Sequence, residues 1–311
     1  MLKLNTLSGF GSGVSGGGGT VGSGWWCGGS TGWDVTAQEL VYATHIVSLV
    51  TTADLSAGGQ SCMGVTDLIN AVGYFCGGNR TGSSDIVDKL VYATKITAAA
   101  TSADLPDACE KQTRFTSDTA GYLPGGTVGG YSLKIVKLTY STATSADLGS
   151  GADIDIGYGS ESAATDPTYG WINCKYNMNK TNKSSDTTAV TTAANLPRET
   201  RFAGSVGTQT LGYGYWFGGG DAPWTIVGTC DRCTFATDTT AALTSGDLPT
   251  ATYMQRCEND SDVNAWLHGG VGDDEAMDLM PFATEITAVN TTAALPSAKS
   301  ETGGVSTNQQ S

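Results

Sequence analysis

Short apolar runs that end in glycine recur along the chain about every fifty residues. In the clearest unit, Tyr74-Phe75-Cys76 runs into Gly77-Gly78, which is typical of a buried strand that enters a turn. Asp104-Leu105-Pro106 closes a later Thr- and Ala-rich run, because proline cannot donate a hydrogen bond to a strand ladder. The unit therefore predicts four short strands, over residues 74–76, 85–92, 96–102 and 112–119.

Two phrases define the repeat. The first is an aromatic residue followed three positions later by a glycine pair, and the pairs are Gly28-Gly29, Gly77-Gly78, Gly125-Gly126, Gly218-Gly219 and Gly269-Gly270. The second is Tyr- or Phe-Ala-Thr, followed about ten residues later by Asp-Leu or Leu-Pro. The fourth unit departs from both phrases, since Cys174-Lys175 replaces the glycines and Lys183 replaces the aromatic residue.

This periodicity predicts the architecture. Repeats of 20 to 50 residues are typical of solenoids, propellers or arrays, and four short strands per unit describe a propeller blade. A solenoid would need capping units with polar outer faces, and the sequence has none. We predict an all-β propeller of six four-stranded blades, or of seven if the two chain ends build one more. The repeats start near residues 24, 73, 121, 170, 214 and 265.

Either end of the chain could supply the strand that completes the first blade. Residues 1–23 are rich in glycine and predict a flexible arm or a closing strand, and residues 24–311 form the propeller. Residues 297–311 resemble the strand that precedes the next aromatic phrase. We favour closure of the ring within one chain. The alternative is a spare strand that pairs with another copy, because an unpaired edge is a template for strand addition.

The glycine-pair phrase and the strand after it resemble the repeats of kelch-type propellers, over about residues 24–300. The usual Trp near the fourth strand of kelch repeats is absent, so the resemblance is to the broader kelch-like group. The Tyr-Ala-Thr phrase with Asp-Leu-Pro looks like repeats of bacteriophage virion and tail-fibre proteins. This resemblance implies a structural or host-attachment protein of a virion, assembled in the host cytoplasm.

Composition and charge exclude several partners. The net charge of −14 disfavours nucleic acid, whose phosphates need clustered Lys and Arg. No apolar stretch approaches the length of a membrane helix, and the N-terminus has no apolar core of a secretory signal. We therefore expect no membrane insertion, and we expect a homo-oligomer that contacts other virion subunits, or a host receptor or glycan.

The residues that could carry chemistry are few. His45 and His268 have no evident nucleophile–base partner, which also disfavours the copper site of galactose oxidase, a kelch-like propeller. Cys230 and Cys233 form an isolated CxxC, for which buried thiols or one local disulfide are the simplest interpretation. Acidic pairs at Asp153/Asp155, Asp260/Asp262 and Asp273-Asp274-Glu275 lack a calcium-loop spacing. We expect no enzyme, cofactor or metal site.

The loops after the glycine pairs differ from unit to unit, and in a propeller they share one rim. Exposed aromatic side chains suit contact with sugar or protein. We therefore predict that binding residues lie on this rim: Trp33, Asp34, Arg80, Tyr131, Tyr176, Trp224, Asp273 and Asp274. The predicted function is a non-enzymatic adhesion or decoration propeller. Glycan binding is the alternative, and a propeller hydrolase is less favoured.

Overall fold

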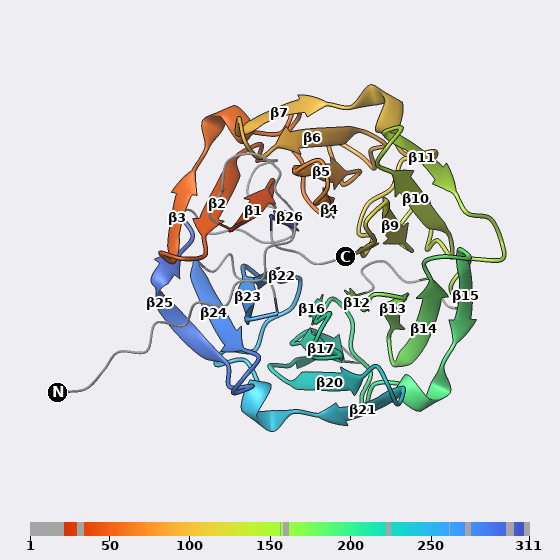
Figure 1. Cartoon of the computed structure of the whole chain (residues 1–311), viewed down its shortest axis with the longest axis vertical. Coiled ribbons are helices and arrows are strands. Elements are labelled where there is room, and N and C mark those ends of the chain that lie inside the picture. The colour runs from red at the N-terminus through yellow and green to blue at the C-terminus, as the bar shows by residue number, and fades with distance from the viewer. Residues whose placement is uncertain are drawn as a thin grey trace.

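The computed structural model is an all-β propeller in which six blades surround a central channel (Figure 1). The structure describes residues 22–29, 34–155, 157, 162–221, 225–260, 262–270, 275–296 and 302–307. Each blade is a four-stranded antiparallel sheet, and the blades follow one another around the ring in chain order. The prediction of six four-stranded blades is confirmed, and the Gly-rich residues 1–21 lie outside the described residues.

The first three blades are given from the channel outward. Blade 1 contains β26 (Gly303–Ser306), β1 (Ser23–Cys27), β2 (Ala37–Val41) and β3 (Ile46–Leu49). Blade 2 contains β4 (Met63–Asp67), β5 (Val72–Cys76), β6 (Val87–Val91) and β7 (Ile96–Ala99). Blade 3 contains β8 (Phe115–Thr116), β9 (Ala120–Pro124), β10 (Ile135–Thr139) and β11 (Thr144–Asp147).

The last three blades have the same order. Blade 4 contains β12 (Ser162–Thr165), β13 (Tyr169–Cys174), β14 (Asn177–Asn182) and β15 (Thr187–Val190). Blade 5 contains β16 (Gly204–Gly207), β17 (Tyr213–Phe217), β20 (Cys230–Thr234) and β21 (Thr239–Ala242), with a small sheet of β18 (Gly220–Asp221) and β19 (Thr225–Ile226) in one loop. Blade 6 contains β22 (Arg256–Asp260), β23 (Asn264–His268), β24 (Ala276–Pro281) and β25 (Ala288–Ala294).

The C-terminal strand closes the ring. β26 pairs antiparallel with β1, so that Val305 lies opposite Trp25 and Ser306 opposite Gly24. Val305 is fully buried, and an added Cβ at Gly73 would lie only 2.7 Å from its side chain. Closure within one chain, which we favoured from the sequence, is confirmed, and it joins the last residues of the chain to the first blade (Figure 1).

The blades begin one strand earlier than the sequence repeats. The strand predicted over 112–119 is shorter, and β8 pairs with β9 of the following blade rather than completing blade 2. The turn between β8 and β9 explains this pairing, because the Ser117 hydroxyl accepts hydrogen bonds from the amides of Thr119 and Ala120. A tight hairpin therefore attaches β8 to β9 and makes it the innermost strand of blade 3.

The second repeated phrase anchors the outer half of each blade. After the outermost strand the chain forms a 3₁₀ turn in four blades: η1 (Thr51–Ala53), η2 (Thr101–Ala103), η3 (Thr192–Ala194) and η4 (Thr244–Gly246). The next residue is Asp54, Asp104, Asn195 or Asp247, and its side-chain oxygen accepts a hydrogen bond of 2.8–3.0 Å from a backbone amide at the start of the third strand. These side chains therefore satisfy backbone groups where the third strand begins.

Stacked aromatic rings join neighbouring blades. The aromatic residue of the first phrase packs against the Tyr or Phe of the second phrase one blade further on, as Trp171 does with Phe235 at 5.0 Å between ring centroids. The same pairing occurs at four other seams: Trp25 with Tyr92, Tyr74 with Tyr140, Tyr215 with Phe282 and Trp266 with Tyr42. The two phrases are therefore the two halves of one contact between blades.

Ion pairs reinforce four of the six seams. In each of these seams, the residue of the third strand that lies opposite the aromatic residue of the first phrase forms an ion pair with a turn residue of the next blade. This turn residue comes three positions after the Tyr, Phe or Lys of the second phrase. The pairs are Glu39–Lys95 at 2.6 Å, Lys137–Asp186 at 2.7 Å, Lys180–Asp238 at 2.9 Å and Arg232–Glu285 at 2.8 Å. Each ion pair is partly exposed, so it contributes only about 0.2–1 kcal/mol to the stability of the fold. Its main effect is to fix how neighbouring blades align.

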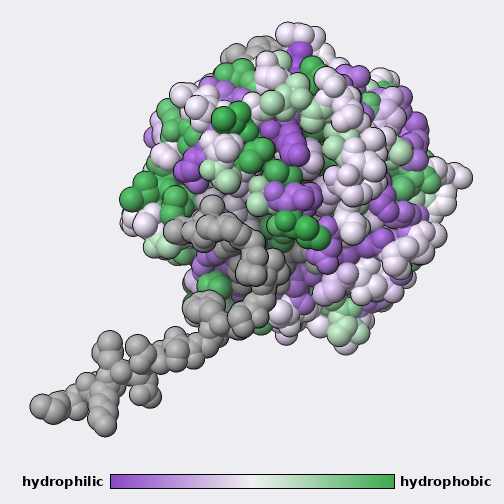
Figure 2. Space-filling model, turned by 45° about the horizontal axis from the view of Figure 1, so that its top comes forward, coloured by the Kyte–Doolittle hydropathy of each residue, from purple (hydrophilic) through white to green (hydrophobic). Residues whose placement is uncertain are grey.

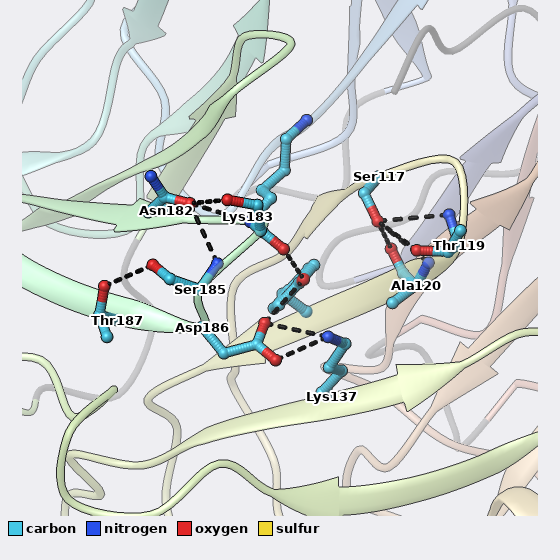
Figure 3. Close-up of polar contacts among 11 residues, drawn as sticks. Ser117, Thr119, Ala120, Lys137, Asn182, Lys183, Ser185, Asp186 and Thr187 are labelled. Atoms are coloured by element: carbon cyan, nitrogen blue, oxygen red, sulfur yellow. Dashed lines mark hydrogen bonds and ion pairs between the residues drawn. The ribbon is translucent and has the colours of Figure 1, made fainter.

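At the seam between blades 3 and 4, other contacts replace the stacked pair of aromatic rings. Lys183 occupies the aromatic position, and Phe115 of blade 3 stacks on Tyr122 instead, with ring centroids 4.6 Å apart. Figure 3 shows Lys183 extending away from Asp186, which faces Lys137. The Lys183 ammonium donates to the Thr116 carbonyl and the Thr165 hydroxyl, and burial lowers its pKa to about 8.

An arginine ties four blades together across the channel. Arg114 precedes β8 of blade 3, and its guanidinium donates to the carbonyls of Gly64 in blade 2, Gly304 in blade 1 and Cys257 in blade 6. It also donates to the carboxylate of Glu258. Burial raises the pKa of Glu258, and Arg114 opposes that rise. The Arg114 side chain therefore links the inner strands of blades 1, 2 and 6 to blade 3.

Candidate recognition rim

The glycine pairs shape one rim of the propeller, which we call the glycine rim. It consists of the loops after the second strand of each blade and the linkers that lead into the next blade. Gly77 and Gly78 have φ values of +60° and +91°, and the Gly78 amide donates to the Cys109 carbonyl at 2.8 Å. The pairs in the other blades that carry them also have positive φ. Each pair bends the chain out of the strand, and the amides of Gly29, Gly78 and Gly219 donate to carbonyls of the linker beside them.

Blade 4 replaces this device with a tight hairpin. Lys175 and Tyr176 form the whole connection between β13 and β14, since Cys174 pairs directly with Asn177. Lys175 takes φ +65°, which substitutes for the missing glycine. As a result the side chain of Tyr176 is about half exposed on the rim.

An open hollow of about 420 Å³ lies on the glycine rim. Lys111, Thr127, Gly129, Gly130, Tyr131 and Phe202 line it. Tyr131 is 65% exposed, and no atom approaches within 4 Å of an added Cβ at Gly129 or Gly130. The hollow therefore combines a flat aromatic face, open backbone and one cation, which suits a ligand that presents both apolar and polar groups.

Two of the residues that line the hollow have unusual backbone conformations. Lys111 and Phe202 have φ values of +58° and +59°, and Ser61 and Met254 at equivalent linker positions have +56° and +62°. A bulky residue rarely adopts this left-handed region, and such strain concentrates at functional sites. The Met254 amide donates to the Phe202 carbonyl at 2.9 Å, so neighbouring linkers hold one another. Sequence analysis did not identify these four linker positions, because they carry four different amino-acid types.

The predicted rim residues other than Arg80 divide into three groups. Tyr131 and Tyr176 are exposed on the glycine rim. Asp34 is partly buried and accepts hydrogen bonds from the amide and hydroxyl of Thr36, so it shapes the end of its loop. Trp33, Trp224, Asp273 and Asp274 lie outside the described residues.

The prediction for Arg80 requires a correction, because its side chain is buried and is not accessible to a binding partner. Its guanidinium pairs with Asp88 at 2.8 Å, and the two side chains are 2% and 0% exposed. It also donates to the carbonyls of Gly77 and Ala57. Arg80 therefore holds the loop of blade 2 against the linker from blade 1, and it does not belong to the recognition surface.

His268 and the cysteines pack in the interior, and His45 is partly exposed. His268 lies against Trp26 at 4.2 Å between ring centroids, and His45 meets Trp266 edge-on at 4.8 Å. All eight cysteines are buried and free, so of the two interpretations of Cys230 and Cys233 the structure supports buried thiols. Burial raises the pKa of Cys233 to about 12, which keeps the thiol protonated and unreactive.

Two residues of the predicted acidic pairs, Asp155 and Asp262, have structural partners. Asp155 accepts hydrogen bonds from the side-chain amides of Asn177 and Asn179. Asp262 of blade 6 accepts from the Gln209 and Thr210 amides of blade 5, so it joins two blades. Among the described residues, no group of three His, Cys, Asp or Glu side chains could hold a metal ion. Within the same part of the chain, no helix is long and apolar enough to span a membrane.

Neither a comparison with protein-family models nor a search of curated proteins found a match for this chain. The six-bladed fold is therefore established by the structure alone. The candidate site is the glycine rim, and its centre among the described residues is the hollow beside Tyr131.

Proposed function

We propose that the chain is a non-enzymatic, kelch-like propeller of a bacteriophage virion, which uses the glycine rim to bind a host receptor or a neighbouring subunit. The observation that carries this proposal is a contrast between two parts of the molecule. Contacts between blades repeat around the ring, with the same stacked rings and ion pairs at most seams. The rim loops do not repeat, and they form an open hollow beside an exposed tyrosine. Variable loops carried by a rigid scaffold are typical of recognition sites.

The phage assignment rests on the repeated phrases. The glycine pairs support the kelch-like group, and Tyr-Ala-Thr with Asp-Leu-Pro supports the likeness to virion proteins. The ring is closed by a strand of the same chain, and most outermost strands are only four residues long. Short outer edges limit unwanted pairing, which suits a particle that is exposed outside a cell.

Glycan binding is the second candidate, and the hollow favours it. The ring of Tyr131 offers an apolar face with a polar edge, and Gly129 and Gly130 leave the backbone open to sugar hydroxyls. A single hollow of this composition would bind one glycan at one place on the rim. This differs from a lectin propeller in which each blade repeats the same pocket.

The test is binding of the labelled full chain to a panel of intact bacterial cells and immobilised bacterial surface polysaccharides. We expect Tyr131→Ala to weaken binding at least tenfold. The matched control is Ile69→Ala, which shortens a 71% exposed side chain in the turn between β4 and β5, away from the glycine rim. Binding to polysaccharide alone would identify the glycan candidate. Equal weakening by both variants, or no binding to any cell or polysaccharide, would contradict recognition by this rim.

A further inference from the structure

Two loops of the glycine rim have the same backbone and different side chains. The loop of blade 3 covers residues 127–131 and that of blade 2 covers residues 79–83, and two backbone hydrogen bonds of 2.8–2.9 Å close each of them. Each loop also pairs with the linker that leads into its blade, as Thr127 does with Glu110 and Asn79 with Gln60. Figure 2 shows apolar and polar side chains interspersed over the face in view, so surface hydropathy alone does not mark a site. The two equivalent loops can instead be compared position by position.

Three equivalent positions carry different side chains in the two blades. Blade 2 has Ser61, Asn79 and Ser83 at these positions, and blade 3 has Lys111, Thr127 and Tyr131. Ser61 is 3% exposed, whereas Tyr131 is 65% exposed. The three blade 3 residues all line the hollow of about 420 Å³. Blade 3 therefore adds a cation and an aromatic ring where blade 2 has only small polar groups.

The tip of the blade 3 loop also leaves its backbone amides open. In blade 2, the side-chain oxygen of Asn79 accepts a hydrogen bond of 2.9 Å from the Gly82 amide. Thr127 replaces that asparagine in blade 3, and within the part of the chain that the structure describes the amides of Gly129 and Gly130 donate to no acceptor. No atom lies within 4 Å of an added Cβ at either glycine, so a ligand can reach both amides.

The Lys111 ammonium has no carboxylate partner. Most described Lys and Arg side chains form an ion pair, as Lys134 does with Asp107 at 2.9 Å. The other exceptions have different contacts: Lys89 lies over the Tyr74 ring, Lys183 donates to Thr116 and Thr165, and Arg256 donates to Thr302. Among the described Lys and Arg residues, Lys111 is the one whose side chain has neither kind of contact. Its charge is therefore available to a ligand in the hollow.

Backbone contacts fix the loop and the linker relative to each other. The Thr127 amide donates to the Glu110 carbonyl at 2.8 Å, next to Lys111. The Lys111 amide donates to the Ser61 carbonyl of the preceding linker at 3.3 Å. The segments that carry the cation and the aromatic ring are thus held together before a ligand arrives, which lowers the entropic cost of binding.

We propose that the hollow beside Tyr131 binds an acidic sugar, whose carboxylate pairs with Lys111 while its ring packs on the tyrosine. Lys111, Gly129 and Gly130 all offer hydrogen-bond donors, and a uronic or sialic acid presents acceptor oxygens around a ring with an apolar face. A neutral sugar would leave the ammonium without a counter-charge. An acidic side chain of a protein would leave the tyrosine ring uncovered.

The acidic character of the chain does not prevent this binding. The net charge of −14 belongs to the whole molecule, and charges more than about 8 Å apart are largely screened at physiological ionic strength. The groups that line the hollow therefore decide the affinity. The inference rests on the proposed recognition function of the glycine rim and gives that function a ligand class.

Calorimetric titration of the full chain with oligosaccharides tests the proposal. The probes are oligomers of hexuronic acid and of sialic acid, each beside its carboxyl-reduced form, which keeps the linkage and the ring but loses the charge. We expect an acidic probe to bind, and its reduced form to bind at least about tenfold more weakly, because a charge-assisted hydrogen bond is lost.

Variants separate the contribution of the charge from that of the ring. Lys111→Gln should weaken binding of the acidic probe at least about tenfold and leave the reduced form unchanged, and Lys111→Arg should retain binding. Tyr131→Ser, which installs the blade 2 residue, should weaken both forms. The matched control is Lys89→Gln, because Lys89 also lacks a carboxylate partner but lies on β6 outside the hollow. Melting curves show that each variant is folded.

Binding to intact cells tells failure of this inference from failure of the proposed function. If cell binding depends on Tyr131 but neither acidic probe binds, or Lys111→Gln changes nothing, the acidic sugar is wrong and recognition by the rim stands. Equal weakening by Lys89→Gln and Lys111→Gln would also overturn the acidic sugar. If cell binding is independent of Tyr131, the proposed function fails together with the inference.

Discussion

At the scale of single residues, Lys183 shows how the ring tolerates an exception. Its ammonium is held by a carbonyl and a hydroxyl rather than by a carboxylate, and burial lowers its pKa from 10.5 to about 8. The unfolded chain therefore binds this proton more strongly than the folded chain does. The charged side chain destabilises the fold at neutral pH, and this penalty disappears as the pH rises from about 8 to about 10.5.

Lys183→Met should stabilise the protein at pH 7. Methionine fills a similar volume without the buried charge, and after loss of the two hydrogen bonds the net gain is roughly 1–2 kcal/mol. The gain should shrink as the pH rises above about 8 and vanish above about pH 10.5, where the wild-type lysine is neutral in the unfolded chain as well as in the folded one. Urea denaturation of both proteins at the two pH values measures this difference. A gain that is the same at both pH values would show that the charge of Lys183 is not the cause.

Arg80 shows why single residues were hard to assign from sequence. It sits in a polar loop, where an arginine is usually exposed, and its burial depends on Asp88 in the next strand and on the Ala57 carbonyl of the preceding linker. The local sequence pattern does not indicate contacts between residues of different segments. The one available signal was Asp88 itself, a carboxylate within a buried strand, which required a cationic partner.

At the scale of elements, the glycine pair is the device that turns a strand into a rim loop. Gly78 has φ +91°, and an added Cβ would lie 2.5 Å from the Cys62 sulfur and 2.7 Å from the Gln60 carbonyl oxygen. The neighbouring linker therefore leaves no room for a side chain. Blade 4 avoids the requirement by shortening the loop to two residues. Sequence analysis recognised the pairs because both constraints select glycine at adjacent positions.

Gly78→Ala should destabilise the protein by about 3 kcal/mol or more, because both backbone strain and a steric clash oppose it. Gly149→Ala isolates the first effect. Gly149 has φ +79° with no atom within 4 Å of an added Cβ, so that substitution should cost only about 1–2 kcal/mol. Chemical denaturation of the two variants measures the difference. Equal losses of stability would mean that the linker does not confine Gly78.

At the scale of the whole molecule, the period of the sequence predicted the ring but not its starting strand. Repeats around a ring have no intrinsic origin, so the phrases alone could not show that β8 belongs to blade 3. The hollow beside Tyr131 and the left-handed backbone conformations of Lys111 and Phe202 could not be predicted from the sequence either. Both arise where segments from different blades meet, and neither depends on one residue type.

Closure by the C-terminal strand gives a prediction at this scale. Deleting residues 302–311 removes β26 and exposes the inner edge of β1, so we expect cooperative melting to be lost or its midpoint to fall by many degrees. Deleting residues 1–21 is the comparison, because that deletion leaves β1, which begins at Ser23, and β26 intact. Calorimetry of both truncated chains measures the two effects. A ring that melts normally without residues 302–311 would contradict closure by β26.

The central claim is that the repeated contacts build the frame and the variable rim performs recognition. The most direct test is to measure, on the same preparation of Tyr131→Ala, the affinity for the cell or polysaccharide that the wild-type chain binds and the melting midpoint. We predict at least a tenfold loss of affinity with an unchanged midpoint, because Tyr131 is exposed and lines the hollow. Wild-type affinity in a variant with an unchanged midpoint would contradict the claim.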